Sequence, residues 1–414
     1  MQTYLVGGAV RDMLTGRDVE DRDYVVVGGT PEQMKRMGFK QVGADFPVFL
    51  DPVTGEEYAL ARREWKDGEG YNGFSTEFTP DVTLEEDLSR RDLTINSMAY
   101  DSGEVFDPFC GVADIENKVL RHTSDAFKDD PVRVLRVARF RARFGPEWTV
   151  APETHALIHQ MAKKGVLNEL TPERVWKEMS RALMEDHPRL FFDTLLETDA
   201  LKAVFPDLYR LKRALESYRW HPEGDAFEHT MLVLTQAAQN GASLEARYAA
   251  LVHDIGKGLT KEEDLPSHHM HDVRGVGVVE RFSNELTVPA QMRNRAMKVT
   301  RYHMYMHKLR DLNPKTYVKM LDDMGVLNDK DVVSLLFQVG VFDERGRLGS
   351  ENNDVTELVF LLVAHDAYRG VKFADVFPDG ETRPMVIQEG LRRARTEAIA
   401  KVKQQQFSTR SVAS

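Results

Sequence analysis

The chain has 414 residues, of which 42% are hydrophobic and 29% charged, as expected for a soluble globular protein with more than one domain. Its formal net charge of −11 argues against indiscriminate nucleic-acid binding by the whole surface, although a local basic groove remains compatible with it. The single cysteine, Cys110, excludes an internal disulfide, and no apolar run is long enough to span a bilayer, so we expect a cytoplasmic protein without a signal peptide.

The first 125 residues have the pattern of an α/β segment. Short apolar runs bounded by Gly, Pro and Asp predict strands at Tyr4–Val6, Tyr24–Val27, Val48–Leu50 and Tyr58–Ala61. From Pro131 onward the apolar period becomes helical, and prolines separate helices of about fifteen residues. The chain is therefore predicted to be α+β, with a small head built on a mixed sheet and a long helical remainder.

The stretch after the first predicted strand carries candidate metal and phosphate ligands. Gly7 and Gly8 would let a phosphate approach backbone N–H groups, and Arg11 and Asp12 follow in a predicted helix. Asp21 and Asp23 have the spacing that places two side chains on one face of a strand. Two adjacent carboxylates suit Mg²⁺ bound together with substrate phosphates. Each feature alone is more often a plain turn or a solvated loop, so the prediction depends on their combination.

Three further features belong to the predicted head. Glu57 is a candidate third carboxylate or, equally, a surface residue of an edge strand. Arg91, beside an apolar run, suits a phosphate group because guanidinium binds phosphate in a bidentate manner, although a surface Arg–Asp network is the alternative. Arg133, Arg136 and Arg139 recur every three residues, so they form a slanted row on one helix, which faces either a nucleotide or solvent.

As an ordered set, these motifs resemble a known family. The segments LVGGAVRD with Asp21–Arg22–Asp23, EEDLSRRDLTIN, Asp107–Gly111, DDPVRVLRVARF and LTPERVWKE resemble class II tRNA nucleotidyltransferases, the CCA-adding enzymes. The similarity is greatest to the bacterial multifunctional kind that carries an HD phosphohydrolase domain. It implies a polymerase-β-like head at 1–125, a helical neck and body at 126–225, an HD domain at 226–345 and a helical tail at 346–414.

The resemblance also implies roles for individual residues. Asp21 and Asp23 would hold catalytic Mg²⁺, and Asp130 with Arg133 would act as an amino-acid template for the base. The nucleotide and its phosphates would be bound by Gly8, Arg11, Arg91, Arg136 and Arg139. The segment Leu60–Phe78, with glycines at 68, 70 and 73, matches the family's flexible loop, which favours complete CCA addition. The expected partners are CTP, ATP and the tRNA acceptor arm, and the expected state is a monomer or homodimer.

A second constellation of candidate metal ligands lies in the helical part. His229 and the adjacent pair His253–Asp254, followed by Ile-Gly-Lys-Gly, are typical of a metal site and resemble the HD superfamily, in which Asp343 is the candidate fourth ligand. His268, His269 and His271 would add ligands, bind phosphate or form a solvated loop. The resemblance implies hydrolysis of 2′,3′-cyclic phosphates and 2′-nucleotides with Ni²⁺ or Mg²⁺. A bacterial poly(A) polymerase and an inactive nucleotide-binding or RNA-binding homologue are the alternative functions.

Overall fold

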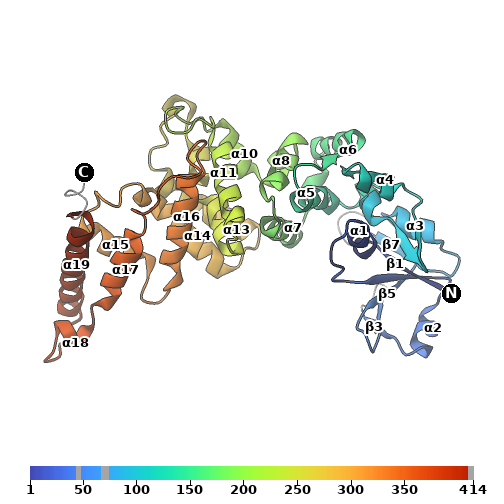
Figure 1. Cartoon of the computed structure of the whole chain (residues 1–414), viewed down its shortest axis with the longest axis horizontal. Coiled ribbons are helices and arrows are strands. Elements are labelled where there is room, and N and C mark those ends of the chain that lie inside the picture. Colours follow the sequence, from blue (N-terminus) through green and yellow to red (C-terminus); the bar gives the residue numbers. More distant parts are fainter. Residues whose placement is uncertain (43–47, 67–73, 409–414) are drawn as a thin grey trace. The chain divides into compact units, whose positions relative to one another are not determined.

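The computed structural model describes residues 1–42, 48–66 and 74–408. The chain forms two compact units, Met1–Val204 and Phe205–Ser414, whose elements are labelled in Figure 1. The finer division at residues 125, 225 and 345 stays a prediction.

A seven-stranded mixed sheet forms the first part of unit 1. Its strand order is β3-β4-β5-β2-β1-β8-β9, and only the β2–β5 pair is parallel among these neighbours. The bounds are β1 Gln2–Val6, β2 Asp23–Val27, β3 Lys40–Val42, β4 Val48–Leu50, β5 Glu57–Leu60, β8 Ala99–Asp101 and β9 Glu104–Phe106. The four strands predicted from the sequence are therefore present, and the α+β fold class is confirmed.

Alternation along β2 explains how both faces of this sheet are covered. Val25 packs in one buried cluster with Val6 and Leu88, whereas its neighbour Val26 packs in another with Met34 and Phe49. The helices and 3₁₀ turns of this part are α1 Gly8–Leu14, α2 Pro31–Arg36, α3 Leu84–Ser89, η1 Thr94–Asn96, α4 Gly111–Glu116 and η2 Asp125–Asp129. Threonines begin α2 and α3 with capping boxes, which satisfy the first N–H groups of both helices.

Two short β-pairs accompany the main sheet. β6 (Arg63–Lys66) and β7 (Phe74–Glu77) form an antiparallel pair, and β10 (Val119–Leu120) and β11 (Thr149–Val150) a parallel one. The glycines at 68, 70 and 73 of the predicted flexible loop lie between β6 and β7, outside the described residues.

Helices make up the rest of unit 1. They are α5 Val132–Phe144, α6 Pro152–Lys163, η3 Val166–Glu169, α7 Pro172–Met184, α8 Arg189–Glu197 and α9 Ala200–Val204. α5 packs against α7 and α8 and buries its apolar residues, including Val134, Val137 and Ala138. This packing directs the arginines of α5 away from its apolar side.

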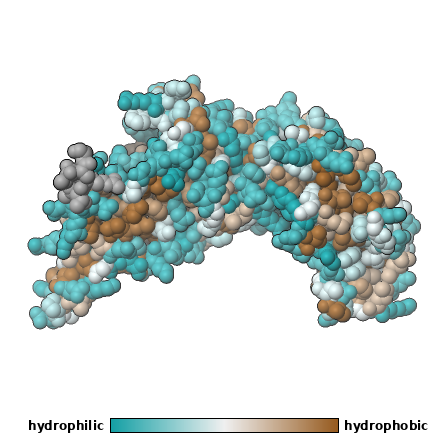
Figure 2. All heavy atoms as spheres, in the orientation of Figure 1, coloured by the Kyte–Doolittle hydropathy of each residue, from teal (hydrophilic) through white to brown (hydrophobic). Residues whose placement is uncertain are grey.

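Within the described residues of unit 2, the regular elements are all helices, and one isolated β-bridge joins Leu215 to Asp225. Its elements are α10 Pro206–Arg210, η4 Leu211–Arg213, α11 Ala226–Gln239, α12 Leu244–Val252, η5 Ile255–Leu259, η6 Glu262–Asp264, α13 His271–Glu285, α14 Ala290–Met306, α15 Pro314–Met324, α16 Asp331–Arg345, α17 Phe360–Gly370, α18 Phe373–Val376 and α19 Pro384–Ser408. Helices α11, α12, α13, α14 and α16 pack on one another. Hydrophilic residues cover most of the face shown in Figure 2. Within the described ranges, none of the helices is both long and apolar enough to cross a membrane.

Candidate functional site

A large cavity in unit 1 is lined by every nucleotide-binding and catalytic residue predicted for the head. Its volume is about 1190 Å³. The predicted residues that line it are Gly8, Arg11, Asp21, Asp23, Arg91, Asp130, Arg133, Arg136 and Arg139. They come from α1, the start of β2 and the residues just before it, the segment after α3, the end of η2, and α5, so the fold gathers residues far apart in the sequence.

Two carboxylates stand at one side of this cavity. Asp23 is the first residue of β2, whereas Asp21 lies before the strand, so the expectation that both belong to the strand is wrong for Asp21. The surrounding protein removes water from the Asp23 carboxyl and raises its pKa, Arg91 lowers it, and the charge of Asp21 raises it further. Hard carboxylate oxygens that repel one another fit a divalent cation such as Mg²⁺.

Glu57 lies beside these two carboxylates. It is the first residue of β5 and stands opposite Asp23 in the parallel register of β5 and β2. Because β5 lies between β4 and β2, the expectation of an edge strand is wrong, although Glu57 is exposed, as a surface residue would be. Asp23 and Glu57 together line a smaller cavity of about 270 Å³. The structure thus places the carboxylate of Glu57, which the sequence indicated as a candidate third carboxylate, next to Asp23.

The Gly-Gly turn lets an arginine approach the backbone. Gly7 has φ of 68°, a conformation that side chains rarely adopt, and a Cβ there would stand 2.8 Å from Nη1 of Arg91. Arg11 follows in α1, where its guanidinium is buried. It donates to Asn96 Oδ1 at 2.6 Å and to both carboxylate oxygens of Asp12 at 2.9 Å. Arg11 is therefore held in one orientation, with its position set by two polar neighbours.

The predicted template pair is also held in place by hydrogen bonds. Arg133 donates from Nη1 to Ala126 O and from Nη2 to Arg90 O, both at 2.6 Å. Asp130 accepts two hydrogen bonds from Arg174, at 2.9 and 2.7 Å. Both side chains line the cavity, so a base placed there would meet a carboxylate and a guanidinium of fixed orientation.

The other two predicted arginines of α5 pair with buried acids. Arg136 Nε donates to Asp92 Oδ2 and Arg139 Nε to Glu178 Oε2, each at 2.6 Å. The row of arginines thus faces the cavity. The alternative, a helix whose arginines face bulk solvent, does not apply here. Six further basic residues on the cavity wall were not predicted as site residues, and they are Arg17, Arg90, Arg143, Arg174, Lys177 and Arg181. The motif LTPERVWKE was the available signal for two of them, Arg174 and Lys177.

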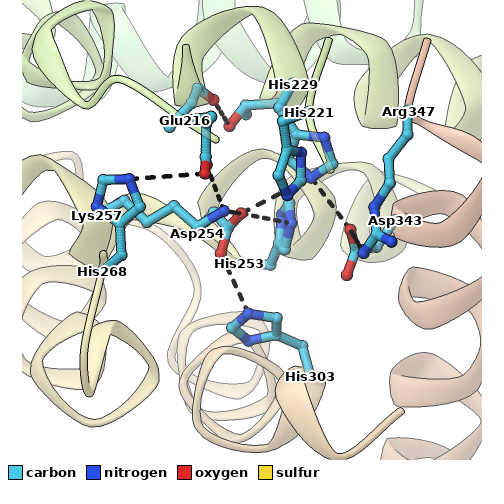
Figure 3. Close-up of polar contacts among 12 residues, drawn as sticks. Glu216, His221, His229, His253, Asp254, Lys257, His268, His303, Asp343 and Arg347 are labelled. Carbon is cyan, nitrogen blue, oxygen red and sulfur yellow. Dashed lines mark hydrogen bonds and ion pairs between the residues drawn. The ribbon is translucent and has the colours of Figure 1, made fainter. Parts of the chain in front are cut away.

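A second site lies in unit 2, where all four predicted HD ligands are buried together. His229 comes from α11, His253 and Asp254 from the junction of α12 and η5, and Asp343 from α16. His229 Nε2 lies 3.1 Å from Asp343 Oδ1 and 3.7 Å from Asp254 Oδ2. His253 Nε2 lies 3.4 Å from the same Asp254 oxygen. Figure 3 shows these groups pointing toward one another.

The outer ring nitrogens of these histidines have partners that orient them. His253 Nδ1 bonds to Ala250 O at 2.7 Å and His229 Nδ1 to Glu223 Oε1 at 3.0 Å. This leaves each Nε2 directed at the carboxylates, as is common for metal-ligating histidines. Although burial alone would raise it, nearby basic groups hold the pKa of Asp254 well below its usual range, so the carboxylate stays ionised. The donor set of imidazole and carboxylate fits a divalent transition metal.

Lys257, Glu216 and His303 also lie around Asp254 and were not predicted as site residues, and His303 Nε2 is 3.1 Å from Asp254 Oδ1. Lys257 Nζ lies 2.7 Å from Asp254 Oδ2 and donates to Glu216 Oε1 at 2.6 Å (Figure 3). The sequence left the role of three histidines undecided. Of these, His268 bonds to Thr260 Oγ1 and Leu215 O, and His269 is exposed. His271 is buried at the start of α13.

Comparison with protein families matches three segments of the chain. Residues 3–121 match the Poly A polymerase head domain, residues 148–211 the probable RNA and SrmB-binding site of polymerase A, and residues 226–328 the HD domain. A polymerase head followed by an RNA-binding segment and an HD domain defines the class: a nucleotidyltransferase joined to an HD domain. Asp343 lies beyond the matched HD range, although the fold places it against His229.

Relatives narrow the class further. The multifunctional CCA proteins of two Acinetobacter baumannii strains, AYE and ATCC 17978, are each 47% identical over 410 residues, covering 99% of both chains. The chain therefore belongs to the family of multifunctional CCA proteins. Members of this family are CCA-adding enzymes that carry an HD domain.

Solved structures show the same fold. The Bacillus stearothermophilus CCA-adding enzyme in complex with CTP aligns with a TM-score of 0.62 and 21% identity, covering 100% of this chain and 95% of that one. The Thermotoga maritima CCA-adding enzyme complexed with tRNA-CCA aligns with a TM-score of 0.61 and 19% identity, covering 97% of this chain and 91% of that one.

Proposed function

We propose that the cavity of unit 1 adds C, C and A to the 3′ end of tRNA from CTP and ATP. The observation that carries this proposal is the joint lining of one cavity by Asp21, Asp23, the arginines of α5 and Asp130. A triphosphate fits such a cavity because its negative charge would be offset by the guanidinium groups and by a divalent cation held by the carboxylates.

Base selection would depend on Asp130 and Arg133. Cytosine and adenine each present an exocyclic NH₂ beside a ring-nitrogen acceptor. Asp130 would accept from the NH₂, while Arg133, which uses two of its five N–H groups on backbone carbonyls, has others to donate to the ring nitrogen. Uracil and guanine would instead bring a carbonyl oxygen against the Asp130 carboxylate, and the repulsion would exclude them.

The reaction would be an in-line displacement in which the tRNA 3′-hydroxyl oxygen attacks the α-phosphorus and pyrophosphate leaves. Asp21 and Asp23, with Glu57 as a third candidate, would hold Mg²⁺, which when bound lowers the pKa of the attacking hydroxyl and offsets the charge on the leaving group. Arg91, Arg136 and Arg139 would bind and orient the phosphates.

The test is a double variant, Asp21→Asn with Asp23→Asn. It should bind CTP but no longer extend tRNA that lacks its 3′ end, because the metal ligands are gone while the arginines remain. Labelled CTP and ATP, offered separately with truncated tRNA, measure this directly. Retained extension would contradict the metal role, and a long A-tail on unrelated RNA would indicate the poly(A) polymerase alternative instead.

For unit 2 we propose a metal-dependent phosphohydrolase acting on 2′,3′-cyclic phosphates and 2′-nucleotides. The supporting observation is the buried set His229, His253, Asp254 and Asp343, whose donors converge from three parts of the chain. Ni²⁺ or Mg²⁺ held there would activate water for attack on a phosphoester. Removal of such terminal phosphates would restore the hydroxyl ends that the transferase extends.

The variant His253→Ala tests this second activity. Hydrolysis of a 2′,3′-cyclic nucleotide should be lost while CCA addition continues, because the head residues lie in the other unit. Loss of both activities in a folded chain would argue against two separate sites. Unchanged hydrolysis would remove His253 from the proposed ligand set.

A further inference from the structure

The segment between η4 and α11 contains a closed loop, Glu216–Gly224. Its two ends are joined by a hydrogen bond from Glu216 N to Gly224 O at 2.9 Å. Within it, the backbone N–H groups of Trp220 and His221 both donate to Ser217 O, each at 2.9 Å, and close a second turn. These bonds hold the backbone of the loop in one conformation, as is common for compact surface loops.

Both ends of the loop contact the site proposed for the phosphohydrolase. At the first end, Glu216 Oε1 accepts from Lys257 Nζ at 2.6 Å. At the other end, Glu223 Oε1 lies 3.0 Å from His229 Nδ1. The ring of His221 also packs edge-to-face on the ring of His229, with the centroids 4.7 Å apart. Figure 3 shows Glu216 and His221 among the groups of this site. The loop is therefore part of the wall of the site.

The middle of the same loop carries two exposed aromatic rings. Tyr218 is 80% exposed and Trp220 is 61% exposed. The guanidinium of Arg219 lies over the Trp220 ring, 4.8 Å from its centroid. Scattered apolar residues on a surface need no explanation, but neighbouring aromatic rings beside a polar site are typical of a ligand contact. The loop thus presents a flat aromatic surface to solvent next to the proposed metal ligands.

The basic residues near the loop indicate what kind of ligand fits. Arg210 and Lys212 are each paired with an aspartate at 2.6 Å. Arg213 and Arg219 are exposed, and neither has an ion-pair partner in the part of the chain that the structure describes. Exposed aromatic rings together with uncommitted arginines are the combination that binds single-stranded nucleic acid, because bases stack on the rings and phosphates pair with the cations.

We propose that Trp220 and Tyr218 form a stacking surface for the base of the nucleotide whose phosphoester is hydrolysed in unit 2. Trp220 directly precedes His221, whose ring contacts the proposed ligand His229, so one nucleotide can place its base on the indole and its phosphate at the metal site. Stacking accepts any base, since every base has a π face. The ligand class is therefore a nucleoside phosphoester at an RNA end, without preference for the base. The stacking surface rests on the phosphohydrolase proposed above.

Two substrates that differ only in the base test the proposal with the full-length chain. They are 2′,3′-cyclic AMP and the 2,3-cyclic phosphate of methyl β-D-ribofuranoside. Trp220→Ala should lower kcat/KM for the nucleotide roughly tenfold, mainly through KM, and leave the base-free substrate unchanged. Trp220→Phe should restore most of the loss. Because the ring is exposed, its removal leaves no cavity in the core.

The matched control is Phe373→Ala, which removes an exposed aromatic ring of α18 outside the loop and should leave both substrates unaffected. An equal loss on both substrates in Trp220→Ala would show that the ring only supports the loop, and this would overturn the proposal. Unchanged hydrolysis of the nucleotide by Trp220→Ala would also overturn it, while the proposed phosphohydrolase would stand.

A binding measurement separates the stacking surface from the hydrolysis itself. The probe is adenosine, the nucleoside that hydrolysis of a 2′-nucleotide releases. It should quench part of the tryptophan fluorescence of the wild-type chain but not that of Trp220→Phe, and methyl β-D-ribofuranoside should quench neither. Quenching without any hydrolysis would support the stacking surface and contradict the proposed phosphohydrolase. Absence of both quenching and hydrolysis would overturn the two proposals together.

Discussion

Arg174 Nη1 and Nη2 donate to Asp130 Oδ1 and Oδ2 at 2.9 and 2.7 Å, so helix α7 fixes the orientation of the carboxylate proposed to read the base. Such a planar two-point contact restricts rotation of the carboxylate in a way that a single lysine ammonium does not. The proposed base selection would thus depend on a residue that is 44 positions away from Asp130 in the sequence.

The variant Arg174→Ala should reduce kcat/KM for CTP and ATP and weaken discrimination against UTP. A charge-assisted hydrogen bond contributes about 1.5–3 kcal/mol, so a loss of roughly tenfold to a hundredfold is expected. Glu173→Ala, an exposed change in the first turn of the same helix, is the matched control and should leave both values unaltered. Equal behaviour of the two variants would show that the Arg174 contact does not act on the base.

The pH dependence of the free energy of unfolding should reveal the ionisation of the Asp92 carboxyl group. Burial alone would raise its pKa, but Arg136 and a hydrogen bond from Asn96 lower it to about 2 from an ordinary 3.8. The folded pKa is depressed, so the ionised group contributes about 2 kcal/mol above pH 4, and this is lost as pH falls toward 2. Thermal unfolding of wild type and Asp92→Asn should therefore differ at pH 7 and converge near pH 2. Glu116→Gln, at an exposed carboxyl, should show no such convergence.

Gly256→Ala should abolish the phosphohydrolase activity proposed for unit 2 while CCA addition survives. The added methyl group would force η5 and the start of α13 apart, which separates Asp254 from His271. Gly277→Ala is the control within α13, because a Cβ there meets nothing within 4 Å and alanine favours a helix by about 1 kcal/mol. The two assays on each variant check the result, and normal hydrolysis by Gly256→Ala would contradict the close packing.

Glu57→Gln should raise the Mg²⁺ concentration needed for half-maximal CCA addition, by roughly tenfold if the carboxylate supports the metal. The reason is its place opposite Asp23 across the β2–β5 pair. Glu104→Gln, at the start of strand β9 in the same sheet, provides the comparison and should leave the requirement unchanged. A Glu57 variant with wild-type metal dependence would restrict the metal ligands to Asp21 and Asp23.

The sequence by itself determined the local elements and the chemical types at each site. Short apolar runs bounded by Gly, Pro and Asp predicted the strands around Val25 and Val48, and the spacing of Arg133, Arg136 and Arg139 predicted a row on one helix. These signals are local, because they depend on the side-chain periods of strands and helices. The ordered motifs also indicated the family, and the identity of relatives over the whole chain confirmed it.

Only the tertiary structure decided which distant groups meet. The pairing of Glu57 with Asp23 comes from the parallel register of two strands, and the contact of Arg174 with Asp130 from the packing of α7 on α5. The position of His303 beside Asp254 depends on how α14 packs within unit 2. A single sequence contains no periodic signal for such contacts, because they are set by the packing of elements that are remote along the chain.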